Sequence, residues 1–392
     1  MKNRERLWRV GTFCVLHLLV FLLHVPLLAA PIERDAAWDA AFFSTDGWAG
    51  GDAAYSVDLR DGRVLWLFAD TWLGPVVQGR RGPGTRLVNN TLAVHPKSPP
   101  GQSPPPQSIR FHWGQPDADG HPTAWIAPDV QRIGPEGWYW LADGAVVRNA
   151  QKENRLVIFL WRMDRLNGRG GAFDFKSLGG AIAIVENPHD PVEQWRATQH
   201  PLPHDGVGTF WGNEVLPVAG QGAGEDLYVF GSRGGQLGSQ LLLARVRDGQ
   251  AERAEAWEFR TADGWSSDPT QAAPLATGLA AEFSISQVKI DTETRWVMVH
   301  HQPMLGRKIM VRFAHTVFGP WSEPQPIFTV AEVDDGKKFF TYAAKAHPEL
   351  SAAGELLITY VVNAFGLGDV LNDASIYRPR FLRLDLRGLP PP

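Results

Sequence analysis

Three acidic residues recur at matched positions along the chain, namely Asp52, Asp143 and Glu214. Each precedes, by the same number of residues, a short apolar run typical of a β-strand. These runs are Trp66-Leu67-Phe68, Val157-Ile158-Phe159 and Tyr228-Val229-Phe230. Paired carboxyl groups perform glycoside hydrolysis, because one protonates the leaving oxygen while the other activates water or attacks the anomeric carbon. A third acid can tune the pKa of the proton donor by like-charge repulsion. The spacing therefore predicts a site for cleaving glycosidic bonds.

A fourth acid, Asp70, is brought beside Asp52 by a predicted β-hairpin. Two β-prone runs, within residues 50–59 and 64–72, flank the turn Arg60-Asp61-Gly62-Arg63. An Asp-Gly pair between such runs is a strong hairpin signal. Asp52 begins the first strand and Asp70 ends the second. Because these two ends lie side by side at the open end of a hairpin, both carboxyl groups are expected at one sheet edge. A capping role in a turn is the alternative for each acid, and for Asp70 it would be a cap before Trp72.

Two further copies of the strand pattern extend the repeat to five units. Their apolar runs are Val297-Met298-Val299 and Ile358-Thr359-Tyr360, and they offer Glu282 and Lys345 one residue out of register. A self-similar β unit with a long, loose period is typical of propeller blades. We therefore expect an all-β fold, a five-bladed β-propeller formed by residues 31–392 as a single domain. The inner strand of each blade begins near the axis, so Asp52, Asp143 and Glu214 should meet in one axial pocket.

Cationic and aromatic residues near these motifs are candidates for substrate binding. A cation beside carboxylates holds them ionised and can bind sugar hydroxyls. Aromatic side chains can pack their faces against sugar rings. The candidates of these kinds, together with one further acid, are Trp72, Trp211, Glu282, Lys345, His347 and Arg378. Core packing is the alternative for the tryptophans, and a structural ion pair is the alternative for Lys345.

Composition argues against several classes of function. The net charge is −4 and no basic run occurs beyond the N-terminus, so nucleic acid is not an expected partner. The single cysteine, Cys14, leaves residues 31–392 without a disulfide or a thiolate metal site. His300 and His301 lack the spacing of a zinc-protease helix, and no catalytic metal or cofactor is predicted. The sequence leaves open whether a structural Ca²⁺ or Na⁺ ion is bound in the axial channel. The chain is expected to be a monomer.

Residues 1–30 have the pattern of a signal peptide or an N-terminal membrane anchor. Basic residues from Lys2 to Arg9 precede an apolar run from about Gly11 to Ala30. Such a basic start followed by an apolar core directs export. The run is also long enough to span a bilayer if it is not cleaved. A secreted, periplasmic or cell-surface location is therefore expected, with membrane contact only through this segment.

The order Asp, Asp, Glu on the first three inner strands resembles the five-bladed propeller glycosidases, such as glycoside hydrolase family 43. In that family, the matching positions are the general base, the pKa modulator and the general acid. The resemblance therefore implies these roles for Asp52, Asp143 and Glu214, respectively.

Longer motifs resemble the unknown-function domain family 4185. They are residues 50–56 and 67–72 near the start, and residues 344–350 and 377–381 near the end. Part of that family is classed as glycoside hydrolase family 183, with endo-D-arabinanase activity on mycobacterial cell-wall arabinan. Two aspartates of the first blade are implicated there. The matching positions in this sequence are Asp52 and Asp70.

The favoured interpretation is an exported glycoside hydrolase that cleaves a polysaccharide, for which the resemblance to family 4185 implies an arabinan. Asp52 would be the base or nucleophile, Glu214 or Asp70 the proton donor, and Asp143 the modulator. The alternative is a non-catalytic carbohydrate-binding propeller of the cell surface, in which the same acids only bind hydroxyls. A third hypothesis is a propeller that binds other proteins and has no functional axial pocket.

Overall fold

The computed structural model describes residues 32–389, apart from 169–170, 206–207, 236–237, 291 and 334–336. The predicted targeting segment, residues 1–30, lies outside the described residues. Within the described part of the chain, no helix is both long and apolar enough to cross a membrane.

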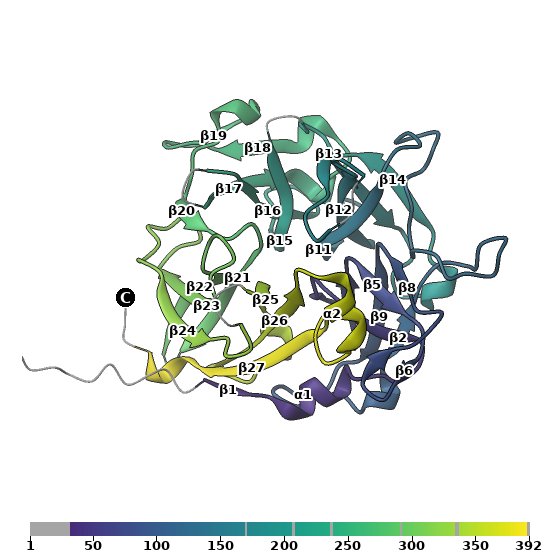
Figure 1. The fold of residues 1–392 in the computed structure, drawn as a ribbon. Coiled ribbons are helices and arrows are strands. Elements are labelled where there is room, and N and C mark those ends of the chain that lie inside the picture. The colour runs from purple at the N-terminus through teal and green to yellow at the C-terminus, as the bar shows by residue number, and fades with distance from the viewer. Residues whose placement is uncertain are drawn as a thin grey trace, which may run out of the picture.

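Five antiparallel sheets of four or more strands surround a common centre (Figure 1). The first contains β3 (Tyr55–Asp58), β4 (Arg63–Phe68), β9 (Thr91–Pro96) and β10 (Arg110–His112). The second contains β11 (Trp138–Arg148), β12 (Asn154–Asp164), β13 (Lys176–Val185) and β14 (Ala197–Pro201). The third contains β15 (Thr209–Ala219), β16 (Glu225–Arg233), β17 (Ser239–Val246), β18 (Trp257–Arg260), β19 (Trp265–Ser266) and β20 (Ala276–Leu279). The fourth contains β21 (Phe283–Ile290), β22 (Glu293–His301), β23 (Lys308–Ala314) and β24 (Gln325–Thr329). The fifth contains β25 (Phe339–Ala346), β26 (Glu355–Ala364), β27 (Pro379–Asp385) and β1 (Ile32–Arg34).

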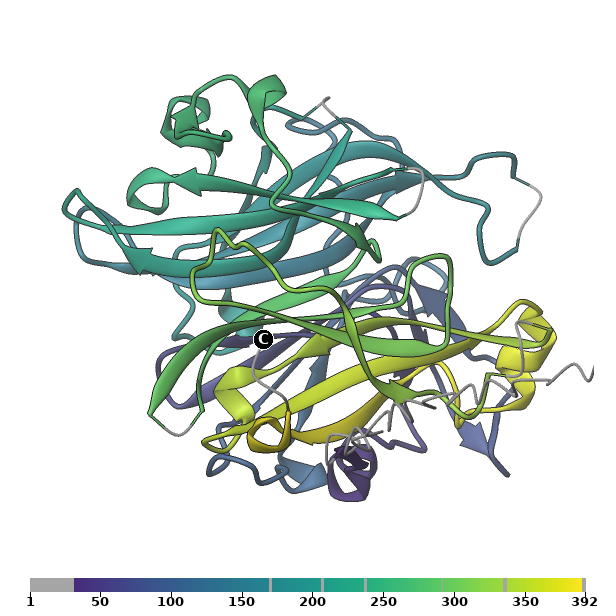
Figure 2. The ribbon, with the colours of Figure 1, turned by 90° about the vertical axis from the view of Figure 1, so that its left-hand side faces the viewer.

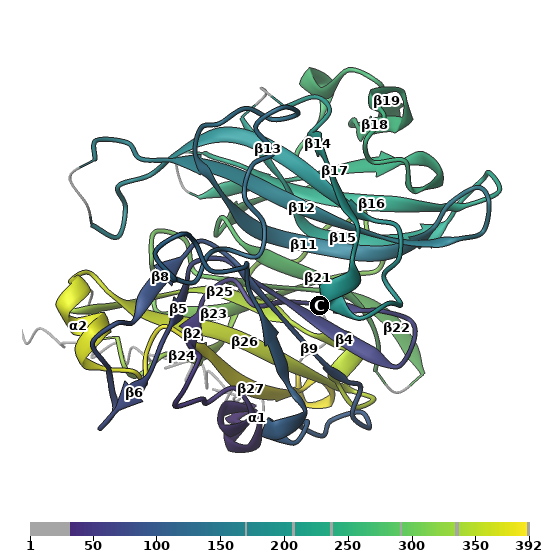
Figure 3. The same cartoon turned by 90° about the vertical axis from the view of Figure 1, so that its right-hand side faces the viewer.

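Smaller elements decorate the first and fifth sheets. They are the sheet of β2 (Trp48–Gly51), β5 (Thr71–Leu73) and β8 (Arg86–Val88), the pair β6 (Val76–Val77) and β7 (Arg80–Arg81), and the helices α1 (Ala36–Ala41) and α2 (Leu367–Asn372). Side views place the second and third sheets on one side of the molecule and the first and fifth on the other (Figure 2, Figure 3). The described chain is all-β, as expected. Its division into five propeller blades stays a prediction.

Second strands of the sheets are almost continuously apolar because they are buried on both faces. Every residue of β26 after Glu355 is buried, and every residue of β4 after Arg63 is buried. A short apolar run bounded by turn residues is typical of such strands. These were the runs that revealed the repeat in the sequence.

The predicted first hairpin is present. Tyr55 pairs with Leu67, and Asp58 pairs with Val64 across the turn at Gly62, which has a positive φ of 87°. At the open end, the Asp52 N–H donates to the Asp70 carbonyl at 3.2 Å. The two aspartates therefore lie side by side, as the sequence predicted.

The two ends of the described chain meet in one sheet. Strand β1 pairs with β27, so that Ile32 lies opposite Leu384. The last of the five sheets is thereby completed by the first strand described. Successive inner strands, β3, β11, β15, β21 and β25, contact one another, so side chains from different sheets can meet near the centre.

Candidate active site

Two cavities follow one another along the inner strands. The larger, here called the Asp52 cavity, has a volume of about 400 Å³ and is lined by residues at the beginnings of these strands, including Asp52, Asp70, Trp140, Phe210, Glu282 and Tyr342. The smaller, here called the Asp143 cavity, has a volume of about 180 Å³ and is lined by residues farther along, including Tyr55, Asp143, Glu214, Lys345, His347 and Glu349.

The expectation that the repeated acids share one pocket is therefore corrected. Asp52 precedes β3, whereas Asp143 and Glu214 come several residues after their strands begin. Both of these acids lie at irregularities in strand pairing, between Leu141 and Gly144 in β11 and at Glu214 in β15. Such bulges redirect side chains locally. Matched spacing in the sequence thus corresponds to two different depths along the axis.

Asp52 is held by two tyrosines from the fifth sheet and the segment before β27. Its Oδ2 accepts hydrogen bonds from the Tyr342 hydroxyl at 2.7 Å and from the Tyr377 hydroxyl at 3.0 Å. Its Oδ1 is buried and has no hydrogen-bond partner among the described residues. An unpaired buried carboxylate oxygen is costly, and the cost is lower when the carboxyl group is protonated.

Asp70 is held by different groups. Its Oδ1 accepts hydrogen bonds from the Trp140 indole N–H at 2.9 Å and from the Asn89 amide at 3.1 Å. N–H groups that donate hydrogen bonds to a carboxylate favour its ionised form. The two aspartates at the end of one hairpin therefore have unequal surroundings.

These surroundings give the two acids different pKa values. Burial, followed by the charge of Asp70, raises the pKa of Asp52 to about 8, although its tyrosine partners oppose the increase. Burial raises the pKa of Asp70 only to about 6, because Trp140 and Asn89 stabilise the carboxylate. At neutral pH, Asp52 is therefore a carboxylic acid and Asp70 a carboxylate. Two carboxyl groups with separated pKa values are the pattern of a general acid and its partner.

Backbone strain is concentrated around this pair. Ala53 and Ala54, which follow Asp52, have φ values of 64° and 56°. Ala343 and Tyr377 have φ values of 60° and 57°. Left-handed backbone is costly for residues other than glycine and accumulates at functional sites. One of these residues, Tyr377, donates a hydrogen bond from its hydroxyl to Asp52.

Aromatic side chains form much of the wall of the Asp52 cavity, and sequence reasoning missed most of them. They include Trp140, Trp161, Phe173, Phe175, Phe340 and Tyr342. Trp140 packs edge-on against Phe175 with ring centroids 4.7 Å apart, and Phe340 stacks on Tyr342 at 5.6 Å. Tyr377 belonged to a recognised motif, but nothing in the sequence indicated that its hydroxyl would reach Asp52.

Lys345 and Glu282 lie between the two cavities. Lys345 is 1% exposed, and its Nζ donates to Glu282 Oε2 at 2.5 Å and to the Ala53 carbonyl at 2.9 Å. The ammonium also lies 4.2 Å from the centre of the Tyr55 ring. Glu282 lines the Asp52 cavity and Lys345 the Asp143 cavity. The pair thus ties the strained turn after Asp52 to the fourth and fifth sheets.

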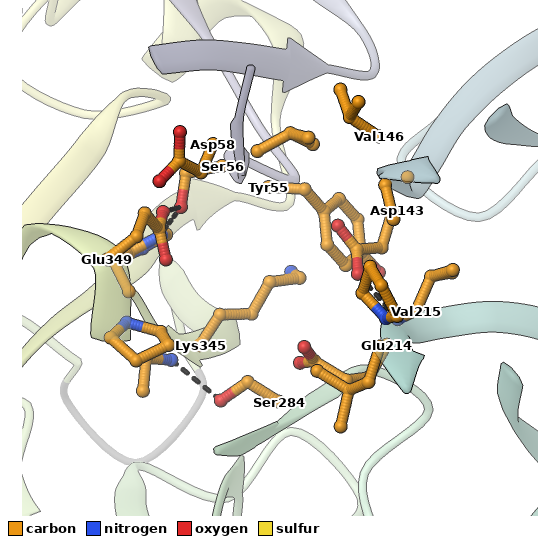
Figure 4. A pocket seen from close by; sticks show the side chains of 18 of the residues that line it. Tyr55, Ser56, Asp58, Asp143, Val146, Glu214, Val215, Ser284, Lys345 and Glu349 are labelled. Carbon is orange, nitrogen blue, oxygen red and sulfur yellow. Dashed lines mark hydrogen bonds between the residues drawn. The ribbon is translucent and has the colours of Figure 1, made fainter. Parts of the chain in front are cut away.

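Asp143 and Glu214 connect neighbouring inner strands. Asp143 Oδ2 accepts a hydrogen bond from the Val215 N–H at 2.7 Å, and Glu214 Oε2 accepts one from the Ile285 N–H at 2.9 Å. Burial raises the pKa of both well above the ordinary range, and the charge of Asp143 adds to the effect on Glu214. Figure 4 shows Lys345 reaching into the middle of this cavity, with Asp143 and Glu214 opposite its end.

His347 lines the Asp143 cavity but is not the cation that was expected. Burial lowers its pKa to about 3, so its ring is neutral. Its Nδ1 lies 2.5 Å from Ser56 Oγ and its Nε2 lies 2.8 Å from Thr359 Oγ1. Ser56 in turn donates to Glu349. This chain of hydrogen bonds fixes the wall between the first and fifth sheets.

Three other substrate-binding candidates are buried away from both axial cavities. Trp72 is 6% exposed and packs near Tyr377 and Arg81. Arg378 is 3% exposed, and its guanidinium lies 4.3 Å from the centre of the Phe43 ring. Trp211 is 1% exposed and lies between the second and third sheets. The expectation that Trp72 and Arg378 bind substrate is corrected, because both side chains are part of the core.

A possible metal-binding group lies elsewhere. Asp117, Asp119 and His121 offer ligand atoms within 4.8 Å of one another, in the segment after β10. None of the three lines an axial cavity. Asp117 is engaged in its own turn, since it accepts N–H donors from Asp119 and His121. Exposed acidic turns of this kind occur without a metal.

One family model matches almost the whole chain. A domain of unknown function, DUF5005, aligns with residues 35–386. This family differs from family 4185, which the motifs resemble. No curated protein shows a significant match.

Several solved structures are similar to this chain, to different degrees. A protein from Bacteroides ovatus, described as a candidate hydrolase, has 19% identity and a TM-score of 0.69, with 90% of this chain and 89% of that chain covered. An α-L-arabinofuranosidase from Podospora anserina has 12% identity and a TM-score of 0.42, with 86% and 91% covered. The catalytic domain of a Coprinopsis cinerea α-L-arabinofuranosidase has 12% identity and a TM-score of 0.43, with 87% and 95% covered. At these identities the Bacteroides ovatus protein indicates the fold alone, and the more distant structures carry no argument.

Proposed function

We propose that this chain, which belongs to the DUF5005 family, is a glycoside hydrolase whose chemistry takes place at Asp52 and Asp70. One observation carries the proposal. Two carboxyl groups from adjacent ends of one hairpin line an aromatic-walled cavity, and their pKa values are separated to about 8 and about 6. Similarity of fold does not choose an activity, so the argument rests on this pair.

The proposed reaction divides the work between the two acids. Protonated Asp52 gives its proton to the glycosidic oxygen as the bond from that oxygen to the anomeric carbon breaks. Ionised Asp70 takes a proton from the attacking water or attacks the anomeric carbon itself. These roles differ from those expected from the sequence, where Asp52 was the base or nucleophile. Because the pKa of Asp52 is higher than that of Asp70, Asp52 is better suited to donate the proton and Asp70 to act as the base or nucleophile.

Aromatic walls support a carbohydrate as substrate. Flat apolar side chains suit the faces of sugar rings, while the acids and tyrosine hydroxyls at the floor can bind hydroxyl groups. We further propose that the five sheets are blades of a propeller, that residues 1–30 direct export, and that an arabinan is the polysaccharide. The arabinan assignment rests on the resemblance of motifs near both ends of the chain to family 4185, part of which is classed as glycoside hydrolase family 183.

The test is the release of reducing ends from a panel of arabinans, including mycobacterial arabinogalactan. Wild type should release them, and Asp52→Asn should lose at least about a hundredfold of the rate, the lower end for removing a general acid. Asp143→Asn is the matched control, because it makes the same change at an aspartate of the other cavity. The absence of release from any arabinan would contradict the substrate, and full activity in Asp52→Asn would contradict the mechanism.

A further inference from the structure

A third cavity lies between the second and third sheets. It is here called the side cavity, has a volume of about 340 Å³, and is lined by residues that include Trp161, Ser177, Asp205, Thr209, Phe210 and Trp211. Trp161 and Phe210 also line the Asp52 cavity. Two cavities that share wall residues are neighbours. The side cavity therefore lies beside the cavity proposed for bond cleavage.

The shared wall is rigidly placed. The Trp161 indole N–H donates to the Trp211 carbonyl at 2.9 Å. The Trp161 ring meets the Phe210 ring edge-on, with centroids 5.3 Å apart. A fixed aromatic residue at the boundary can contact a ligand that extends from one cavity into the other.

Two residues that line the side cavity carry buried polar groups without a hydrogen-bond partner in the described part of the chain. Thr209 is 7% exposed and Trp211 is 1% exposed, and neither the Thr209 hydroxyl nor the Trp211 indole N–H has a hydrogen-bond partner among the described residues. Buried polar groups are usually paired, so each unpaired one asks for an explanation. A ligand with several hydroxyl groups could pair with donors and acceptors of this kind.

The charged residues that line the cavities indicate the charge of the ligand. Asp205 is the charged side chain of the side cavity, and its Oδ2 accepts a hydrogen bond from the Gly180 N–H at 2.7 Å. Among the described residues, neither the side cavity nor the Asp52 cavity has a lysine or arginine in its lining. An anionic sugar such as a uronate would meet carboxyl groups there without a cation to bind it. The two cavities suit a neutral sugar chain.

We propose that the side cavity is a second sugar-binding subsite, which holds a neighbouring residue of the same neutral polysaccharide chain whose bond lies at Asp52 and Asp70. This inference rests on the proposed function. It deepens that function by naming the substrate as an extended neutral chain, not a single terminal sugar on a small leaving group. Binding of the distant residue then contributes to the rate of cleavage.

The test compares kcat/KM for a long neutral arabino-oligosaccharide with kcat/KM for an aryl arabinofuranoside. Ser177 is exposed at the rim of the side cavity, so Ser177→Phe should fold normally while filling the entrance. We expect this variant to lower the ratio of the two values about tenfold, equivalent to about 1.4 kcal/mol. Thr209→Val should lower the ratio by less, since it removes one hydroxyl. Ser375→Phe is the control, because Ser375 is exposed and lines none of the three cavities, and its ratio should equal that of wild type.

Each outcome has a separate meaning. An active wild type with an unchanged ratio in Ser177→Phe would overturn the subsite and leave the proposed function standing. A wild type that hydrolyses neither substrate, and whose Asp52→Asn variant binds neither by calorimetry, would overturn the proposed function and the subsite with it. Equal calorimetric binding of an oligogalacturonate and the neutral oligosaccharide would overturn the neutral assignment.

Discussion

The pair Asp52 and Asp70 in the Asp52 cavity and the pair Asp143 and Glu214 in the Asp143 cavity are held in different ways. Asp52 and Asp70 accept hydrogen bonds from side chains, which come from Tyr342, Tyr377, Trp140 and Asn89. In the Asp143 cavity, Asp143 and Glu214 each accept a backbone N–H group of the next inner strand. The first arrangement sets the charge of the acids, and the second joins one sheet to another.

This difference shows that a repeated residue need not have a repeated role. A carboxyl group bonded to a neighbouring backbone replaces a missing strand-to-strand hydrogen bond, so it serves the fold. A carboxyl group with an unpaired oxygen beside a large cavity, next to strained backbone, costs stability and is better explained by chemistry. The predictions below test this division.

The largest effect is expected from the acids themselves. Asp70→Asn should reduce kcat by roughly a hundredfold to ten-thousandfold, because it removes the ionised partner of the proton donor. Glu214→Gln should reduce it by less than about tenfold, since the amide oxygen can still accept the Ile285 N–H. Initial rates on the same glycan measure both. Equal losses would show that the two cavities share one function.

Lys345→Met should be the most destabilising change. Its ammonium is buried between the cavities, and its removal leaves Glu282 without a cation. Breaking a buried ion pair on one side costs about 3–5 kcal/mol of unfolding free energy. Lys97→Met is the control, since the ion pair of Lys97 with Asp58 is partly exposed and should be worth about 1 kcal/mol or less. Urea denaturation gives both values, and similar losses would contradict a central role for Lys345.

Substitutions of Asp143 and Asp52 should also differ in their effect on the free energy of unfolding. Asp143→Ala leaves the Val215 N–H without its acceptor and should cost about 1–3 kcal/mol. Asp52→Asn should cost little, and at alkaline pH it should stabilise. The reason is that folding raises the pKa of Asp52 to about 8, so stability is lost as pH rises through that value, whereas asparagine does not ionise. Thermal unfolding at pH 5 and pH 9 tests this, and a large loss in Asp52→Asn at both values would assign that residue to the fold.

The smallest effect concerns the tyrosine beside Asp52. The Tyr342 hydroxyl bonds to Asp52 and lowers its pKa, so Tyr342→Phe should move the alkaline limb of the activity profile to higher pH. The rate at pH 7 should change by less than about tenfold, the equivalent of one strong hydrogen bond. Tyr139→Phe, which removes a hydroxyl bonded to Gln199, should leave the limb in place. If the alkaline limb does not move in Tyr342→Phe, the Tyr342 hydroxyl does not set the pKa of the proton donor.

The first hairpin shows how far the sequence could predict this site. An Asp-Gly turn between alternating strands fixes a local register, so the proximity of Asp52 and Asp70 followed from residues close together in the chain. The all-β class and the repeat were visible for a similar reason, because central strands such as β4 and β26 are buried and mostly apolar.

Other features depended on contacts between distant segments. Whether Asp143 shares a pocket with Asp52 depends on how far β11 runs before its bulge, and spacing alone does not fix that depth. The tyrosines that hold Asp52 come from segments about 300 residues away, with separations of 290 and 325. Burial made His347 neutral and Arg378 part of the core, and neither result is written in the local sequence.

The most direct test of the central claim is the pH dependence of kcat/KM for wild type on a glycan that it cleaves. The account predicts a bell-shaped profile, because activity needs Asp70 ionised and Asp52 protonated. The rate should rise through about pH 6, as Asp70 loses its proton, and fall through about pH 8, as Asp52 does. A profile whose two limbs persist unchanged in Asp143→Asn would fit this assignment. An alkaline limb that is absent in wild type, or that disappears in Asp143→Asn, would contradict it.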